Sequence, residues 1–142
     1  MAARFLIEQG HEVVLHGRND DRSRDALKAA SGARGAVTGD LSTIAGARTV
    51  AAQVNKLGHF DAVIHNAGIG YREGLVEMEP GVPSVFAVNV LAPYILTALI
   101  KKPDRLVYVS SGTRHASRRA TAHGRSALDE ASLERLFGLR GE

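Results

Sequence analysis

Short β-branched apolar segments alternate with segments of helical periodicity, and this order restricts the fold more than any other feature of the chain. The predicted strands are residues 12–16, 35–38, 60–65 and 106–109, and the predicted helices are residues 1–9, 20–30, 43–57 and 82–100. The strands are nearly all apolar, as expected for strands buried on both faces. Alternating strands and helices form right-handed crossovers. We therefore predict a doubly wound α/β fold, a parallel sheet with helices on both sides.

Length and composition exclude several classes of protein. The 142 residues fit one domain, no apolar run approaches the roughly 18 residues of a membrane span, and the first ten residues do not resemble a secretory signal. The chain has no cysteine, which excludes disulfides and thiolate metal sites. Its six histidines have no local ligand spacing, and we expect that no carboxylate clusters with them and that there is no metal site. The default compartment is the cytoplasm.

The excess positive charge is concentrated in one stretch of the chain. The net charge is +3, and five arginines lie between residues 105 and 128, where no acidic residue occurs. We expect residues 113–142 to form a basic, divergent tail with a short helix at 127–137. A solvated tail is the simpler interpretation, and an anionic partner is the alternative. The tail has a single aromatic residue, Phe137, on which a base could stack, which makes a nucleic-acid partner unlikely.

Ligands bind at the carboxyl ends of strands in such sheets, so the residues that follow each strand are candidate site residues. Arg18 stands where an acidic residue would bind the ribose 2′-hydroxyl of NAD, and a basic residue there suits the 2′-phosphate of NADP. A surface arginine is an equally good interpretation. Asp40 follows the next strand, either as a ligand of an adenine amino group or as a helix-capping residue.

Two further strand ends and one helix carry candidates. Asn66, Ala67 and Gly68 follow the third strand, where small residues permit close approach of a ring or sugar, or simply form a turn. Asn89 interrupts an apolar helix, and a buried amide must brace a loop or hold a water. Ser111 ends the last strand and could bond a substrate carbonyl or cap the next segment.

In order and spacing, these positions resemble the short-chain dehydrogenase/reductase family over residues 1–112, a partial Rossmann dinucleotide-binding domain. Arg18 and the histidine before Asn66-Ala67-Gly68 resemble the NADP-using, retinol-dehydrogenase-like members. The resemblance implies hydride transfer between NADP(H), or less often NAD, and a small-molecule carbonyl or alcohol. It also implies a pairing of subunits through the helix at 82–100.

The resemblance assigns a role to each candidate. It implies that Ser111 polarises the substrate carbonyl, that Asn89 holds a relay water, and that Arg18 binds the 2′-phosphate. It further implies cofactor contacts by the residues that end two strands, which are Asp40 and Leu41 at the adenine and Asn66, Ala67 and Gly68 along the cleft.

The chain departs from the family pattern at both ends. The family begins with a strand and a Thr-Gly-x-x-x-Gly-x-Gly turn that receives the pyrophosphate, and this sequence starts in what resembles the following helix. That strand is central, so we expect a sheet in two halves with two open edges, lacking the C-terminal strands as well. The family's Tyr-x-x-x-Lys is also absent after Ser111. We expect weak NADP binding and an inactive, truncated oxidoreductase domain. The alternatives are a non-catalytic binding or regulatory module and a basic anion-binding protein.

Overall fold

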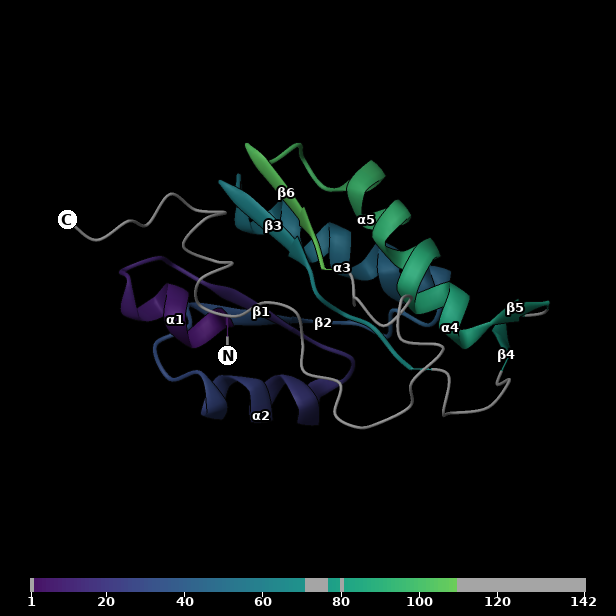
Figure 1. Cartoon of the computed structure of the whole chain (residues 1–142), viewed down its shortest axis with the longest axis horizontal. Coiled ribbons are helices and arrows are strands. Elements are labelled where there is room, and N and C mark those ends of the chain that lie inside the picture. The colour runs from purple at the N-terminus through teal and green to yellow at the C-terminus, as the bar shows by residue number, and fades with distance from the viewer. Residues whose placement is uncertain (1, 71–76, 80, 110–142) are drawn as a thin grey trace, which may run out of the picture.

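The computed structural model describes residues 2–70, 77–79 and 81–109, and its elements alternate as the sequence predicts (Figure 1). The elements are α1 (Ala2–Glu8), β1 (Val14–Gly17), α2 (Asp20–Ala29), β2 (Gly35–Thr38), α3 (Ile44–Leu57), β3 (Ala62–His65), β4 (Glu77–Glu79), β5 (Val82–Pro83), α4 (Ser84–Phe86), the π-helical segment η2 (Ala87–Leu91), α5 (Ala92–Leu99) and β6 (Arg105–Tyr108).

The four main strands form two separate parallel pairs. β1 pairs with β2, Val14 opposite Gly35, and β3 pairs with β6, Ala62 opposite Arg105. No pairing among the described strands joins these two sheets. β1, β2 and β3 run in the same general direction in Figure 1, so their carboxyl ends lie toward one side. The sheet is thus in two halves, as the sequence predicts.

Two strands, β1 and β3, each have one edge without a described strand beside it, and we call them the inner strands. The carbonyls of Val13 and Gly17 accept hydrogen bonds from the β2 side (2.9 and 3.1 Å). Because backbone groups alternate along a strand, those of Val14 and His16 face the other edge of β1. The same alternation turns the backbone of Ala62 on β3 away from β6, since the carbonyl of Asp61 accepts a hydrogen bond from the amide of Arg105.

The outer edge of β2 is closed by a side chain. Gln53 of α3 accepts from the amide of Thr38 with its Oε1 (3.1 Å) and donates to the carbonyl of Thr38 with its Nε2 (2.7 Å). The carboxamide therefore makes both hydrogen bonds that a neighbouring strand would make to this residue.

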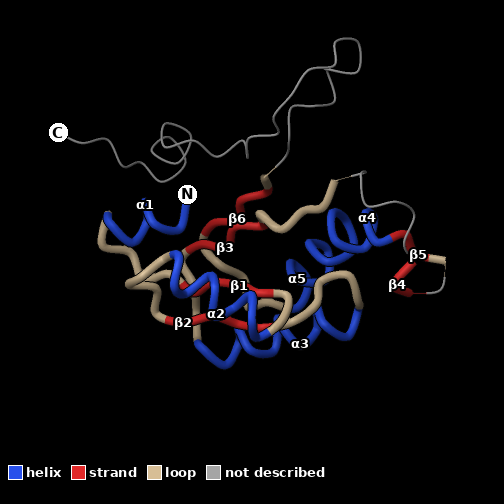
Figure 2. The backbone as a smooth tube through the Cα atoms, turned by 90° about the horizontal axis from the view of Figure 1, so that it is seen from below, coloured by secondary structure: helices blue, strands red, loops and turns tan. Residues whose placement is uncertain are grey.

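One apolar core connects the two sheets. α3 and α5 pack against each other and contribute most of its buried residues, and inner strands contribute at its margin (Figure 2). The buried set comprises Val37, Leu41, Ala47, Val50, Ala51, Ala92, Leu96 and Ile100, with Val14, Val54, Val63 and Ile95 partly buried beside it. α2 packs against β1 and β2. The helices therefore hold together two sheets that, among the described residues, share no hydrogen-bonded strand.

Local sequence explains where the helices begin and end. Asn19 accepts from the amide of Arg22 and is the N-cap of α2, and Thr43 accepts from the amide of Gly46 and is the N-cap of α3. Both caps were among the residues that the sequence favours for this role. α1 ends before Gly10, which has a left-handed φ of 85°.

Several expectations need correction. The sequence predicted no strand between Gly68 and the helix at 82–100, but β4 and β5 form a short antiparallel pair in that interval. The helix itself begins at Ser84 rather than residue 82 and contains the π-helical turn η2. The strands are not buried on both faces, because β1, β2 and β3 are mostly half-buried and β6 is mostly exposed. Predictions for residues 113–142, including the domain boundary and the helix at 127–137, fall outside the described residues. No described helix is long and apolar enough to span a membrane.

Candidate cofactor site

The carboxyl end of β1 brings Arg18 and Asp40 near each other. Arg18 follows Gly17 and is exposed, and Asp40 follows β2 by two residues and is exposed as well. His16 donates from its Nε2 to the carbonyl of Gly39 (2.8 Å), which ties the end of β1 to the end of β2. The site residues of these two strands are therefore held by a cross-strand side-chain bond in addition to the sheet register.

The side chain of Asp40 is held by hydrogen bonds within its own turn. Its Oδ1 accepts from the amide of Ser42 (2.9 Å) and from the Ser42 hydroxyl (2.7 Å). Burial would raise the pKa of Asp40, but these hydrogen bonds and the positive charges of Arg18 and His16 outweigh it and lower the pKa below its usual value. Asp40 thus stabilises the turn before α3 while Thr43 caps that helix.

Arg18 has no carboxylate within ion-pair distance among the described residues, although it is close enough to Asp40 to influence its titration. An exposed guanidinium at a strand end, unpaired within the described part of the chain, is able to receive an anionic group.

Leu41, unlike Arg18, is buried. Its side chain is 8% exposed and belongs to the core, so only its backbone is available for the predicted adenine contact.

The loop after β3 is held by Asn89. The Oδ1 of Asn89 accepts from the amide of Ile69 and its Nδ2 donates to the carbonyl of Ile69, both at 2.9 Å. Its Oδ1 also lies 3.4 Å from where a Cβ on Gly68 would be. The expectation that Asn89 is buried is wrong, because its side chain is exposed. Of the two predicted roles, the structure has the side chain bracing the loop, and its role at a relay water stays a prediction.

Asn66, Ala67 and Gly68 are all exposed at the end of β3. The Asn66 amide donates to the carbonyl of Ile64 (3.1 Å), which turns the chain out of the sheet. Small exposed residues here leave the backbone accessible, in keeping with the predicted cofactor cleft. Ser111 lies outside the described residues, so its predicted role is untested by the geometry.

Sequence reasoning missed a polar chain between β3, β6 and α5. The hydroxyl of Thr97 lies 3.3 Å from Nε2 of His65 and 2.6 Å from the hydroxyl of Tyr108. The rings of His65 and Tyr108 stack with centroids 4.9 Å apart. Burial lowers the pKa of His65, which favours its neutral form. Three residues far apart in sequence make this chain, and only the strand register could have revealed it.

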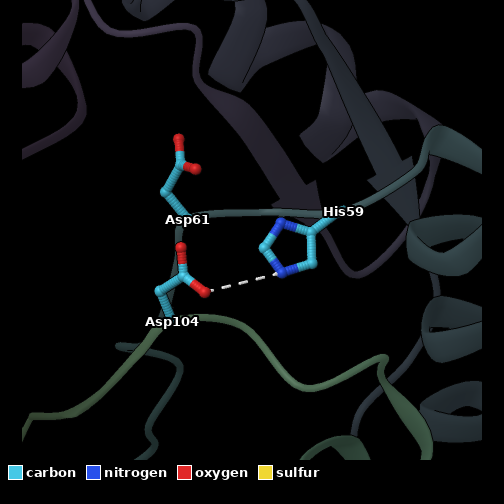
Figure 3. A group of neighbouring side chains, drawn as sticks. All are labelled: His59, Asp61 and Asp104. Carbon is cyan, nitrogen blue, oxygen red and sulfur yellow. Dashed lines mark ion pairs between the residues drawn. The ribbon is translucent and has the colours of Figure 1, made fainter.

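The expectation that no carboxylate clusters with a histidine is also wrong. His59, Asp61 and Asp104 form a group at the opposite ends of β3 and β6 from the candidate cofactor site (Figure 3). The 45-residue separation of His59 and Asp104 hides this group from any local spacing rule.

Comparison with known proteins identifies the family. Residues 1–118 match the sequence profile of the short chain dehydrogenases. The uncharacterized oxidoreductase AN7799 of Emericella nidulans is 44% identical over 149 aligned positions, which cover 98% of this chain and 58% of that protein. The short-chain dehydrogenase chry4 of Gibberella zeae is 42% identical, with 99% and 50% covered.

The solved structures agree with the sequence relatives. A metagenomic short-chain oxidoreductase in complex with NADP is 28% identical, with a TM-score of 0.60, and the match covers 78% of this chain and 55% of that one. The chain therefore spans roughly half the length of the proteins it matches. With a doubly wound architecture, and with its candidate residues at the ends of the parallel strands, this chain belongs to the short-chain dehydrogenase/reductase family.

Proposed function

We propose that this chain is the NADP-binding part of a short-chain oxidoreductase that acts on a small-molecule carbonyl or alcohol. The observation that carries the proposal is the exposed guanidinium of Arg18 at the carboxyl end of β1, with no described carboxylate paired to it. A phosphate dianion at the ribose 2′-position matches this charge, whereas a 2′-hydroxyl would need an acceptor. The NADP complex of a 28% identical relative supports the choice of cofactor.

The remaining cofactor contacts follow from the strand ends. Asp40 has one carboxylate oxygen occupied by Ser42, which leaves the other for an adenine amino group. The backbone of Asn66-Ala67-Gly68 lines the other half of the site, positioned by the bond of Asn89 to the loop. NADP(H), when bound, supplies the hydride. The chain's own residues bind and orient it.

Cofactor titration tests the proposal. The intact chain is titrated with NADPH and with NADH, which lacks the 2′-phosphate, and binding is followed by nicotinamide fluorescence. We expect weak binding with a preference for NADPH, and we expect Arg18→Glu to remove the preference. Arg48→Glu is the matched control, because Arg48 is an exposed arginine of α3 and the change alters net charge equally.

Two results would overturn the proposal. One is equal affinity for the two cofactors in the unaltered chain. The other is an equal loss of NADPH affinity in Arg18→Glu and Arg48→Glu, which would mean that overall charge rather than a phosphate site governs binding.

We also propose that this chain alone does not catalyse reduction. Within the given sequence no tyrosine follows Ser111, so the usual proton donor of the family has no counterpart there. We expect no NADPH oxidation with a panel of aldehydes and ketones under conditions where NADPH binds. Turnover that Ser111→Ala abolishes would contradict this proposal without affecting the binding proposal.

Self-association through the helix at 82–100 is a further proposal. Phe86, Val90 and Tyr94 recur every four residues and are 51%, 50% and 71% exposed, which makes one apolar stripe. We expect Val90→Glu to convert a dimer to a monomer in light scattering, and Leu57→Glu, a change at an exposed leucine on α3, to have no such effect. The retinol-dehydrogenase-like subtype and the cytoplasmic location stay predictions.

A further inference from the structure

His59, Asp61 and Asp104 converge at the amino ends of β3 and β6. Asp61 precedes β3 and Asp104 precedes β6, and the pairing of Ala62 with Arg105 makes the two aspartates cross-strand neighbours. The carbonyl of Asp61 accepts from the amide of Arg105 (2.9 Å), so the backbone at this point is fixed by the sheet. His59 lies two residues before Asp61 in the short connection between α3 and β3.

The three side chains offer ligand atoms at a spacing near that of a metal site. One ligand atom from each residue lies within 4.8 Å of the other two, and Nε2 of His59 is 3.8 Å from Oδ1 of Asp104. Figure 3 shows the imidazole turned toward the Asp104 carboxylate, while the neighbouring Asp61 carboxylate points away from this pair. Bonds of about 2.0–2.2 Å to zinc imply ligand atoms about 3.3–3.6 Å apart in a tetrahedron. Each atom must therefore move by about 1 Å at most, which exposed side chains can do by rotation.

The donor set distinguishes among cations. Two carboxylates and one imidazole suit first-row transition dications such as Zn²⁺, whereas Mg²⁺ and Ca²⁺ prefer sites made of oxygen ligands alone. The two aspartates carry charges that repel each other when no cation is present, and a dication neutralises both. We propose that His59, Asp61 and Asp104 form a surface site for Zn²⁺ or a similar transition dication, with water completing the coordination.

The site has a structural consequence. It connects the segment after α3 to the segment before β6, which the β3–β6 pairing brings side by side. A bound ion would therefore stabilise the parallel pair at its amino end, remote from the candidate cofactor site at its carboxyl end. By linkage, an ion that binds only the folded chain raises the melting temperature.

Calorimetric titration of the intact chain with ZnCl₂ at pH 7.5, followed by thermal melts, tests the site. We expect a site of one equivalent and a higher melting temperature in the presence of Zn²⁺. His59→Ala and Asp104→Asn should each weaken this binding by at least about tenfold, since loss of even an outer-shell partner costs that much. His11→Ala and Asp25→Asn are matched controls at exposed positions outside the group, and they should bind as the unaltered chain does.

All three side chains are exposed, so we expect their replacement to leave the fold intact. A loss of Zn²⁺ binding in a variant can therefore be distinguished from unfolding. The proposal is overturned if His59→Ala binds Zn²⁺ as tightly as the unaltered chain, or if no binding of one equivalent is seen. It is also overturned if MgCl₂ raises the melting temperature as much as ZnCl₂ at equal concentration, because that result would indicate screening of the two carboxylates alone.

Discussion

The bond between Asn89 and the loop after β3 leads to the most specific prediction. Two hydrogen bonds of 2.9 Å join the Asn89 side chain to the amide and carbonyl of Ile69. Each such bond contributes about 0.5–1.5 kcal/mol net, and the exposure of Asn89 places the pair in the lower half of the summed range. Asn89→Ala should therefore make opening of the loop about 1–2 kcal/mol easier. That corresponds to a 5–30-fold faster exchange of the Ile69 amide proton.

A second variant separates the two bonds. In Asn89→Asp the acceptor for the Ile69 amide remains, but a carboxylate oxygen replaces the Nδ2 donor and faces the Ile69 carbonyl. We expect this variant to be at least as unstable locally as Asn89→Ala at neutral pH. Below about pH 4 the protonated carboxyl can donate to the Ile69 carbonyl. The exchange rate of the Ile69 amide, compared with its intrinsic rate at the same pH, should then fall again.

Asn55 provides a matched control. It donates from Nδ2 to the carbonyl of Leu99 and accepts from the amide of Lys101, both at 2.8 Å, so it makes the same kind of two-bond bridge elsewhere. Asn55→Ala should lower the free energy of unfolding and leave Ile69 exchange close to normal after correction for global stability. The reasoning is refuted if Asn89→Ala leaves Ile69 exchange unchanged, or if Asn55→Ala accelerates it equally.

The structure predicts the effect of three further substitutions on stability or aggregation. Gly46→Ala should destabilise the chain by several kcal/mol in urea unfolding, because the new Cβ would lie 2.0 Å from the backbone carbonyl oxygen of Asp40, whereas Gly35→Ala meets no atom within 4 Å and should be tolerated. Burial lowers the pKa of His65 in the folded state, so this histidine binds a proton more readily in the unfolded chain. The free energy of unfolding should therefore fall as pH drops below about 6.5, and His65→Gln should flatten that pH dependence. Gln53→Ala should open the edge of β2 and increase concentration-dependent aggregation, measured by light scattering, and a variant that stays monomeric would contradict this.

Local chemistry explains which parts of the fold could be predicted. Asn19 and Thr43 carry short polar side chains directly before helical periodicity, and both are caps in the structure. β2 occupies residues 35–38 as expected, because its apolar residues lie between turn residues. Glu77–Glu79 has charged residues at alternate positions and so gives no signal of an apolar strand, and β4 was missed for that reason.

Long-range chemistry explains what could not be predicted. The exposure of Asn89 depends on where the loop after β3 lies, and the helix sequence alone suggested burial. The group of His59 with Asp104 depends on the register of two strands that are 40 residues apart in sequence. The hydroxyl of Thr97 meets His65 and Tyr108 only because α5 crosses that same pair of strands.

The division of the sheet bears directly on the candidate site. Arg18 and Asp40 stand on the β1–β2 pair, and Asn66-Ala67-Gly68 stands on the β3–β6 pair. Within the described residues no strand joins the pairs, so their relative position depends on the core that α3 and α5 build between them. A dinucleotide that contacts both halves therefore binds only as well as this core holds them in place, and a ligand that contacts one half alone does not depend on it. In the part of the chain that the structure describes, the two halves of the candidate cofactor site are coupled through side-chain packing rather than through backbone hydrogen bonds.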